Sequence, residues 1–187
     1  MQHTFPLPSL DVAPFRLTGT VIGVLMNHRP ALYALGEAVN QAPYKAAPKA
    51  PVLFVKPRNT LARSGQPVAV PDEPGQVEVS AQLGIVIGRQ CTRVAPEAAL
   101  AHVAGYLVVN DISLPHSQFY RPSVRLKARD GFCPLGARVV PADQVAQPDA
   151  LEVRVLIDGQ LVQVSNTGDR FRGVAQLIAD EIGRAHV

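Results

Sequence analysis

One short apolar run constrains the fold more than any other part of this sequence. Residues 106–109 are continuously apolar, and Asn110 and Asp111 follow them directly. A run of this length with a polar end is typical of a buried strand. The pattern therefore predicts a sheet built around this segment, with the Asp111 carboxylate presented where the chain leaves that sheet.

A group of cations follows this strand. Lys127 lies among Arg121, Arg125 and Arg129. Ammonium and guanidinium groups bind carboxylates, so this group predicts a small anionic ligand. The alternatives stay open at this point. The arginines can form an exposed, salt-bridged stretch, Lys127 can be a solvated cation, and Asp111 can be an ordinary turn or helix cap.

The rest of the chain predicts a mixed α/β, β-rich fold. Apolar patterning indicates strands at residues 20–26, 52–55, 77–88, 151–157 and 160–164, the last two joined by an Asp158-Gly159 turn. Helical spacing indicates helices at residues 30–41, 96–103 and 171–182, and Asn166-Thr167 is placed to cap the last of them. Because residues 77–88 become continuously apolar, we expect them to form a central strand.

Length and composition favour one domain. The chain has 187 residues, of which 47% are hydrophobic, and this is enough to bury a core. Residues 1–16 contain three prolines and no periodicity, so they are expected to be a flexible N-terminal arm. The single domain is then expected to span residues 17–187.

The net charge and the two cysteines limit the classes of partner and the compartment that we expect for this protein. The net charge is only +3 and the basic residues are mostly scattered, which argues against a nucleic-acid partner. No apolar run approaches the roughly 20 residues that span a bilayer, so no membrane partner is expected. Cys91 and Cys133 lack metal-ligand spacing and are expected to be reduced thiols in a cytoplasmic protein.

Several runs together resemble the fumarylacetoacetate hydrolase family, and they occur in the family's order. They are KPRN at 56–59, LGIVIG at 83–88, GYLVVNDIS at 105–113, YRPSVRLKARDGFCPLG at 120–136 and IDGQLVQ at 157–163. Within the family, the third and fourth runs are most similar to members that isomerise and decarboxylate oxo-diacids in aromatic catabolism. The resemblance implies the fold of the family's C-terminal domain.

The resemblance also implies a site. Family members hold Mg²⁺ or Mn²⁺ with a Glu-x-Glu pair and a later Asp, and they act on small anionic oxo-di- or tricarboxylates. Asp111 matches the metal-binding Asp, and Lys127 matches the active-site Lys. Lys56, Arg121 and Arg125 are candidates for binding the substrate, although Lys56 can equally be a lysine that snorkels from a strand end.

Two departures from the family pattern put the chemistry in question. The Glu-x-Glu pair should fall at Ser80 and Gln82, which bring no negative charge to a divalent ion. Glu78 has the same strand parity and is a weak substitute. The family's catalytic His is also missing, since Ala31 lies near its position, and His28 is the candidate that takes its role.

Two hypotheses follow for the function. The chain is part of an isomerase/decarboxylase, or it is a non-metal-binding half or subunit that supports a catalytic partner. Either version implies a homo-oligomer or pairing with a second half of the same fold. Family members continue past the last predicted helix, so we expect a truncated domain. The last seven residues, EIGRAHV, also correspond to one frame of a common sequencing adapter, and we expect them to be an artefact.

Overall fold

A small antiparallel sheet forms the centre of the molecule. The structure is a computed structural model, and it describes residues 10–117 and 124–184. The long strands β6 (Glu78–Ile87) and β7 (Val103–Ser113) cross its middle, and the sheet order is β6-β7-β9 with β9 at Val140–Pro141. The remaining strands of the described residues form two-stranded pairs around this sheet. The fold is therefore mixed and β-rich, as predicted.

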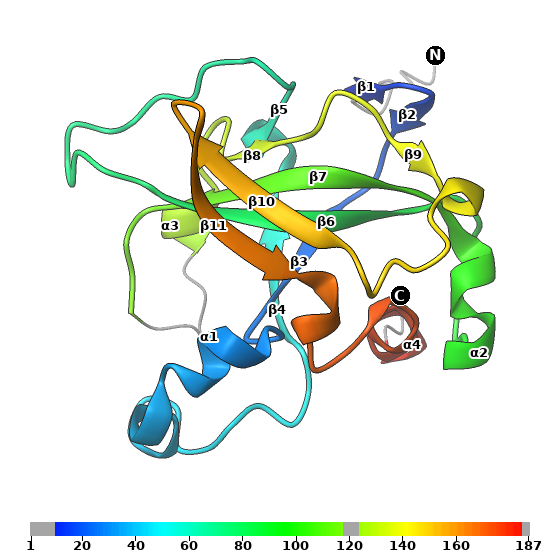
Figure 1. Cartoon of the computed structure of the whole chain (residues 1–187), viewed down its shortest axis with the longest axis horizontal. Coiled ribbons are helices and arrows are strands. Elements are labelled where there is room, and N and C mark those ends of the chain that lie inside the picture. The colour runs from blue at the N-terminus through cyan, green and yellow to red at the C-terminus, as the bar shows by residue number, and fades with distance from the viewer. Residues whose placement is uncertain (1–9, 118–123, 185–187) are drawn as a thin grey trace, which may run out of the picture.

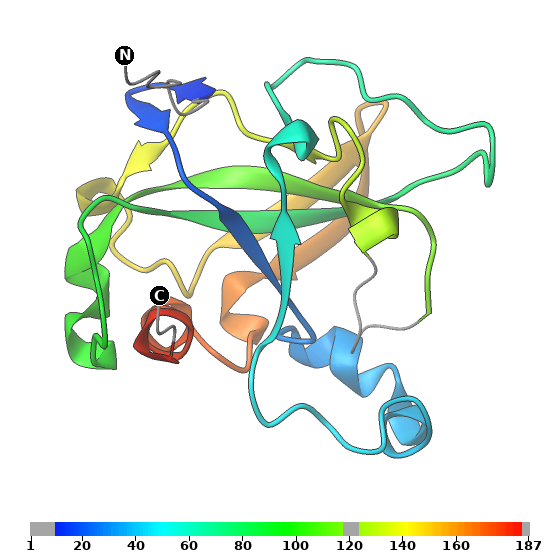
Figure 2. The ribbon, with the colours of Figure 1, turned by 180° about the vertical axis from the view of Figure 1, so that it is seen from behind.

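The paired strands bring distant parts of the chain together. They are β1 (Leu10–Val12) with β2 (Phe15–Leu17), β3 (Val21–Leu25) with β4 (Val52–Lys56), β5 (Leu61–Ala62) with β8 (Cys133–Pro134), and β10 (Glu152–Ile157) with β11 (Gln160–Asn166). Figure 2 shows the β3–β4 pair crossing the face of β6 and β7 that Figure 1 hides. This crossing brings the end of β4 toward β7.

The central strands differ from the prediction in two respects. Strand β7 continues past Asp111, which pairs with Ser80 of β6 inside the ladder. Asp111 thus lies within the strand, not where the chain leaves the sheet, because buried partners described below satisfy its charge. Strand β6 is at one edge of the three-stranded sheet, and β7 is the central strand. The apolar run in β6 has a different cause from the one predicted.

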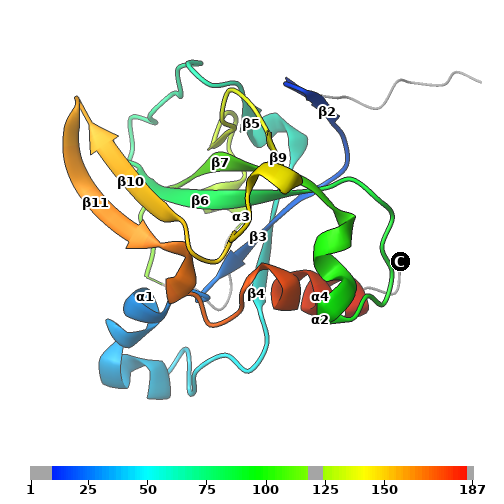
Figure 3. The same ribbon diagram turned by 45° about the vertical axis from the view of Figure 1, so that its right-hand side comes forward.

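The apolar run in β6 is explained by packing against both faces of the strand. Leu83 and Ile85 of β6 pack on a cluster that includes Tyr106. Val86 packs instead on a second cluster around Leu107. The helices α2 (Pro96–Ala99) and α4 (Val174–Arg184) lie side by side and contribute to the first cluster (Figure 3). An edge strand can therefore be apolar on both faces when each face has its own cover.

The N-terminal segment is more structured than predicted. Residues 10–17 form the β1–β2 hairpin, and Val12 is only 4% exposed. Val12 packs with Leu107 and Cys133 in the second cluster. The flexible arm predicted over residues 1–16 thus includes part of the core, because a short proline-containing segment can still bury an apolar side chain. Residues 1–9 lie outside the described part.

The predicted helices are present in modified form. The helix predicted at 30–41 is divided into α1 (Arg29–Tyr33) and a 3₁₀ turn at Gly36–Asn40. Gly36 has φ 51°, a left-handed conformation that ends α-helices. The helix predicted at 96–103 is α2 followed by a 3₁₀ turn at Leu100–His102. The short helix α3 (Val124–Lys127) carries the active-site lysine candidate.

The C-terminal hairpin and helix are confirmed, but Asn166 caps the 3₁₀ turn that follows it and not the helix. The hairpin turn has positive φ at Asp158 (51°) and Gly159 (78°), as the Asp-Gly pair predicts. Asn166 accepts a hydrogen bond from the Gly168 N–H in a 3₁₀ turn at Thr167–Asp169. Asp149 instead accepts from the first N–H of α4, at 3.0 Å from Val174 N. A carboxylate distant in sequence replaces the local cap.

Other short 3₁₀ turns complete the described chain, at Arg58–Thr60 and Ala142–Gln144. None of the helices in residues 10–117 and 124–184 has the length and apolar character needed to cross a bilayer. Both cysteines are free thiols, as predicted.

Candidate functional site

Three buried charged residues meet at the crossing of β4 and β7. Lys56 Nζ lies 2.7 Å from Asp111 Oδ1, and Lys127 Nζ lies 2.7 Å from Asp111 Oδ2. Lys56, Asp111 and Lys127 are 2%, 6% and 4% exposed. Buried charges persist when they are paired and hydrogen-bonded. We call these three residues the ion triad; its two cations and one anion leave a net charge of +1.

Lys56 is the internal anchor of the triad. Its ammonium donates to the carbonyls of Ile112 at 2.7 Å, Phe132 at 2.8 Å and Lys127 at 3.0 Å. An ammonium has three hydrogens, and these three carbonyls take all of them. The Lys56–Asp111 contact is accordingly an ion pair, and Asp111 Oδ1 receives no hydrogen bond in the described structure. Burial lowers the Lys56 pKa, and Asp111 opposes that shift.

This anchoring decides between two readings of Lys56. A snorkelling lysine keeps its charged end in water, whereas the Lys56 ammonium is enclosed. The snorkelling alternative is therefore wrong. A contact between Lys56 and substrate stays a prediction.

Lys127 is held by an aromatic ring that the sequence did not single out. Its ammonium donates to Asp111 Oδ2 and lies 4.4 Å from the centroid of the Phe54 ring. A cation at this distance from a ring face is attracted by the ring quadrupole. Phe54 pairs with Gly23 across the β3–β4 ladder, and any side chain at Gly23 would clash with the ring. The signal in the sequence was Gly23 inside a strand pattern.

The β6–β7 register places Ser80 and Gln82 beside Asp111. Ser80 pairs directly with Asp111, and Gln82 pairs with Val109 two residues along. Paired residues and alternate residues share one face of a sheet, so Ser80 and Gln82 face the same side as Asp111. The Gln82 amide donates to Ser80 Oγ at 2.7 Å. The carboxylate of Glu78 lies 3.7 Å from His116 Nδ1 instead of turning to Asp111.

Arg125 and His28 are not part of the triad. Arg125 lines a hollow of about 370 Å³ whose other lining residues are Glu73, Pro74, Leu114, Pro115, Leu126 and Arg129. Lys127 does not line this hollow. Its neighbour in the chain, Leu126, does line the hollow. Arg121 lies outside the described residues.

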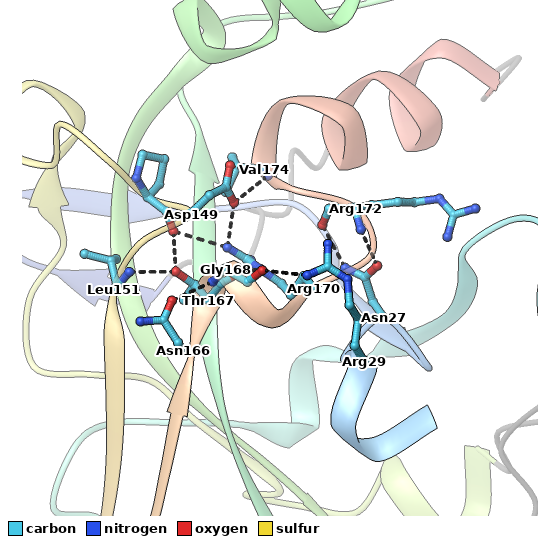
Figure 4. A network of polar contacts seen from close by, with 11 residues as sticks. Asn27, Arg29, Asp149, Leu151, Asn166, Thr167, Gly168, Arg170, Arg172 and Val174 are labelled. Carbon is cyan, nitrogen blue, oxygen red and sulfur yellow. Dashed lines mark hydrogen bonds and ion pairs between the residues drawn. The ribbon is translucent and has the colours of Figure 1, made fainter. Parts of the chain in front are cut away.

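His28 belongs to a polar network that ties the N-terminal part of the chain to the C-terminal part. Its backbone forms a bridge with Arg170, and its Nε2 is buried without a hydrogen-bond partner in the described structure. Figure 4 shows the neighbouring contacts: Asn27 Nδ2 donates to the Arg172 carbonyl at 3.0 Å, and Arg172 N–H donates to Asn27 Oδ1 at 2.9 Å. In the same network Arg170 Nη2 lies 2.9 Å from Asp149 Oδ1. A proton-transfer role for His28 stays a prediction.

Cys133 lies against the triad as a packed thiol. It is 1% exposed and belongs to the cluster around Leu107. Burial raises the pKa of Cys133 to about 11, so the thiol stays protonated at neutral pH. It therefore contributes packing and not nucleophilic chemistry.

The fold and the site define a family. The chain belongs to the fumarylacetoacetate hydrolase family, whose "Fumarylacetoacetate (FAA) hydrolase C-terminal" model matches residues 20–184. It is 40% identical over 163 residues to the 4-hydroxyphenylacetate degradation bifunctional isomerase/decarboxylase of Escherichia coli, covering 87% of this chain and 37% of that protein. It is 34% identical over 135 residues to the mitochondrial oxaloacetate tautomerase fahd2 of Xenopus laevis, covering 71% of this chain and 42% of that protein. The chain spans less than half the length of these relatives.

Solved structures agree with this assignment. The 5-carboxymethyl-2-hydroxymuconate delta-isomerase from Mycobacterium smegmatis superposes with a TM-score of 0.69 at 28% identity, covering 89% of this chain and 62% of that one. The maleylpyruvate hydrolase from Sphingobium sp. SYK-6, in complex with manganese (II) ion and pyruvate, superposes with a TM-score of 0.68 at 28% identity, covering 88% of this chain and 54% of that one. The predicted family and fold are therefore confirmed.

The residues of this chain do not fit a manganese site of the expected kind. In the described residues, no group of three or more His, Cys, Asp or Glu side chains is arranged to hold a metal. Both oxygens of Asp111 face ammonium groups, and the positions beside it carry a hydroxyl and an amide. Divalent ions such as Mn²⁺ and Mg²⁺ are held through several oxygen ligands that include carboxylates.

Proposed function

We propose that this chain is part of an isomerase/decarboxylase that acts in the breakdown of aromatic acids such as 4-hydroxyphenylacetate. The observation that carries the proposal is the 40% identity to the bifunctional isomerase/decarboxylase over 87% of the chain. The activity is proposed for the whole protein, because the chain spans only 37% of that relative.

We propose a small oxo-di- or tricarboxylate as the substrate. The net positive charge of the ion triad favours an anion beside it. Arg125 and Arg129 add two further cations at the neighbouring hollow. In this proposal Arg125 and Arg121 bind carboxylates of the substrate, with Lys56 as a third, inner cation.

The two reactions require the same kind of negative charge to be stabilised. Decarboxylation breaks a C–C bond and leaves the electron pair on a dienolate, whereas isomerisation moves a proton between carbons through a similar dienolate. Both reactions build negative charge on the 2-oxo oxygen. A fixed cation beside that oxygen stabilises the charge without reorganising, and Lys127 is our candidate for it. His28 is our candidate for carrying the proton.

The test uses the longest native polypeptide that contains this chain. Two substrates are used. Isomerisation of 2-hydroxyhepta-2,4-diene-1,7-dioate is measured as loss of dienol absorbance, and decarboxylation of 5-carboxymethyl-2-oxo-hex-3-ene-1,7-dioate is measured as CO₂ release. We expect Lys127→Met to lower kcat about 100-fold or more, the usual effect of removing one oxyanion donor. The matched control is Lys49→Met, whose side chain is exposed. Inactivity of the unmodified protein toward both substrates would refute the proposal.

A second candidate is a supporting half without chemistry of its own. Ser80 and Gln82 favour it, because neither brings a charge to the face that carries Asp111. In this version the chain forms a homo-oligomer or pairs with a second half of the same fold, which holds the catalytic groups. The same experiment separates the two candidates: full turnover by the Lys127→Met protein supports the supporting role.

We propose further that residues 17–187 belong to one incomplete domain, whose core also contains Val12 of the β1–β2 hairpin, and that the chain works in the cytoplasm. The support for an incomplete domain is that the chain covers 62% of the Mycobacterium smegmatis structure. The support for the cytoplasm is the pair of free cysteines, since such thiols persist in reducing compartments.

A further inference from the structure

We propose that the ion triad takes the place of a divalent metal in this chain, and that Ser80 and Gln82 are the positions that exclude the ion. The claim concerns metal binding by these residues and does not depend on the proposed reaction. Its first basis is the state of Asp111. Each of its carboxylate oxygens lies 2.7 Å from an ammonium nitrogen, so both are already compensated by a positive charge.

The ammonium groups cannot leave easily. Lys56 donates to three backbone carbonyls that come from β7, from α3 and from the segment before β8. Those three hydrogen bonds need three hydrogens, so this geometry keeps Lys56 as an ammonium. The ammonium of Lys127 lies over the Phe54 ring, which packs into the space left by Gly23. An incoming cation would therefore meet two fixed positive charges.

No nearby carboxylate offsets them. The triad carries a net charge of +1, and a divalent ion at Asp111 would raise the local charge to +3. Ser80, opposite Asp111, is neutral, and its hydroxyl accepts a hydrogen bond from neutral Gln82. Glu78 lies near His116. If Ser80 and Gln82 were both glutamates, their two carboxylates and that of Asp111 would lie beside the two lysines, and the net charge of these five groups would be −1.

The experiment counts bound Mn²⁺ in the longest native polypeptide that contains this chain. Free Mn²⁺ is measured by electron paramagnetic resonance during titration, so no substrate is involved. We expect Asp111→Asn to leave the number of bound ions unchanged. We expect Ser80→Glu with Gln82→Glu to add one bound ion per chain, and Asp111→Asn in that background to remove it. The matched control is Gln160→Glu with Gln163→Glu on β11, which adds the same charge elsewhere and should add no ion.

Two results would overturn the proposal. One is a loss of one Mn²⁺ per chain when Asp111→Asn is made in the unmodified sequence. The other is no gain of Mn²⁺ in the folded Ser80→Glu, Gln82→Glu protein, since neutral residues would then not be what excludes the ion. A second measurement leaves Asp111 unchanged, so it does not depend on whether the Asp111→Asn protein folds. With fluorophenylalanine at position 54, we expect stoichiometric Mn²⁺ to broaden the ¹⁹F resonance only in the double-glutamate protein. Broadening in the unmodified sequence would contradict the proposal.

Discussion

The ion triad and the β10–β11 hairpin reverse the usual distribution of residues in a protein. The triad encloses three charges at 2–6% exposure, whereas Leu156, Ile157, Leu161, Val162 and Val164 of the hairpin are 51–58% exposed. The triad is satisfied by partners within the described chain. The hairpin projects from one side of the molecule (Figure 3). Its exposed apolar side chains are typical of a surface that contacts another protein or subunit. The buried charges thus have their partners within the described chain, whereas these apolar side chains stay exposed on its surface.

The largest expected effect comes from breaking the triad. Asp111→Asn removes the anion between two buried lysines, and an uncompensated buried charge costs about 3–5 kcal/mol. We expect the free energy of unfolding in urea to fall by about this amount. The control is Asp11→Asn, whose carboxylate is 73% exposed in a surface ion pair with Arg16 and should contribute less than about 1 kcal/mol. Equal effects of the two changes would mean that the triad is not the tightly coupled unit described here.

A pH dependence should follow from Cys133 beside the triad. Burial raises its pKa from 9.0 to about 11, so the folded state holds this proton more tightly than the unfolded chain does. The associated stability is fully present below pH 9 and is lost as the pH rises through 11. The loss should approach about 2–3 kcal/mol. We expect Cys133→Ala to flatten the decline in unfolding free energy over this range, whereas Cys91→Ala should flatten it less, because burial also raises the Cys91 pKa but encloses that thiol far less than Cys133.

Gly23 tests how the aromatic ring is held over the triad. Gly23→Ala places a methyl group against Phe54, and overpacking of this kind costs about 1–3 kcal/mol. The double variant Gly23→Ala, Phe54→Leu should recover part of that loss, because the smaller side chain leaves room. Thermal unfolding of the four proteins of this cycle measures the coupling. Strict additivity would show that the ring and the glycine do not interact.

The smallest effect on stability is expected on the exposed hairpin. Leu161→Thr with Val164→Thr should change the unfolding free energy by less than about 0.5 kcal/mol, since both residues are already more than half exposed. The same variant should lower self-association in sedimentation velocity, and Gln163→Thr on the same strand serves as the control. A large loss of stability would show that the hairpin packs on another part of the protein.

Local patterns were sufficient for much of the backbone. The apolar runs located β4, β6 and β7, and Pro96 marked the start of α2. The Asp158-Gly159 pair specified the hairpin turn, because its backbone conformation is a property of those residues. Failures occurred where a distant residue replaced a local one. Asp149 caps α4 in place of Asn166, and Val12 enters the core from a segment that was expected to be loose.

The site divides in the same way. The sequence by itself determined the family, the candidate residues Asp111 and Lys127, and the absence of a carboxylate at Ser80 and at Gln82. Only the tertiary structure decided that Lys56 joins Asp111 and Lys127, that Ser80 lies opposite Asp111, and that Phe54 covers Lys127. The physical reason is that a strand or a turn is set by neighbouring residues. An ion pair at 2.7 Å between β4 and β7 depends instead on how the strands cross and on the burial that this crossing creates.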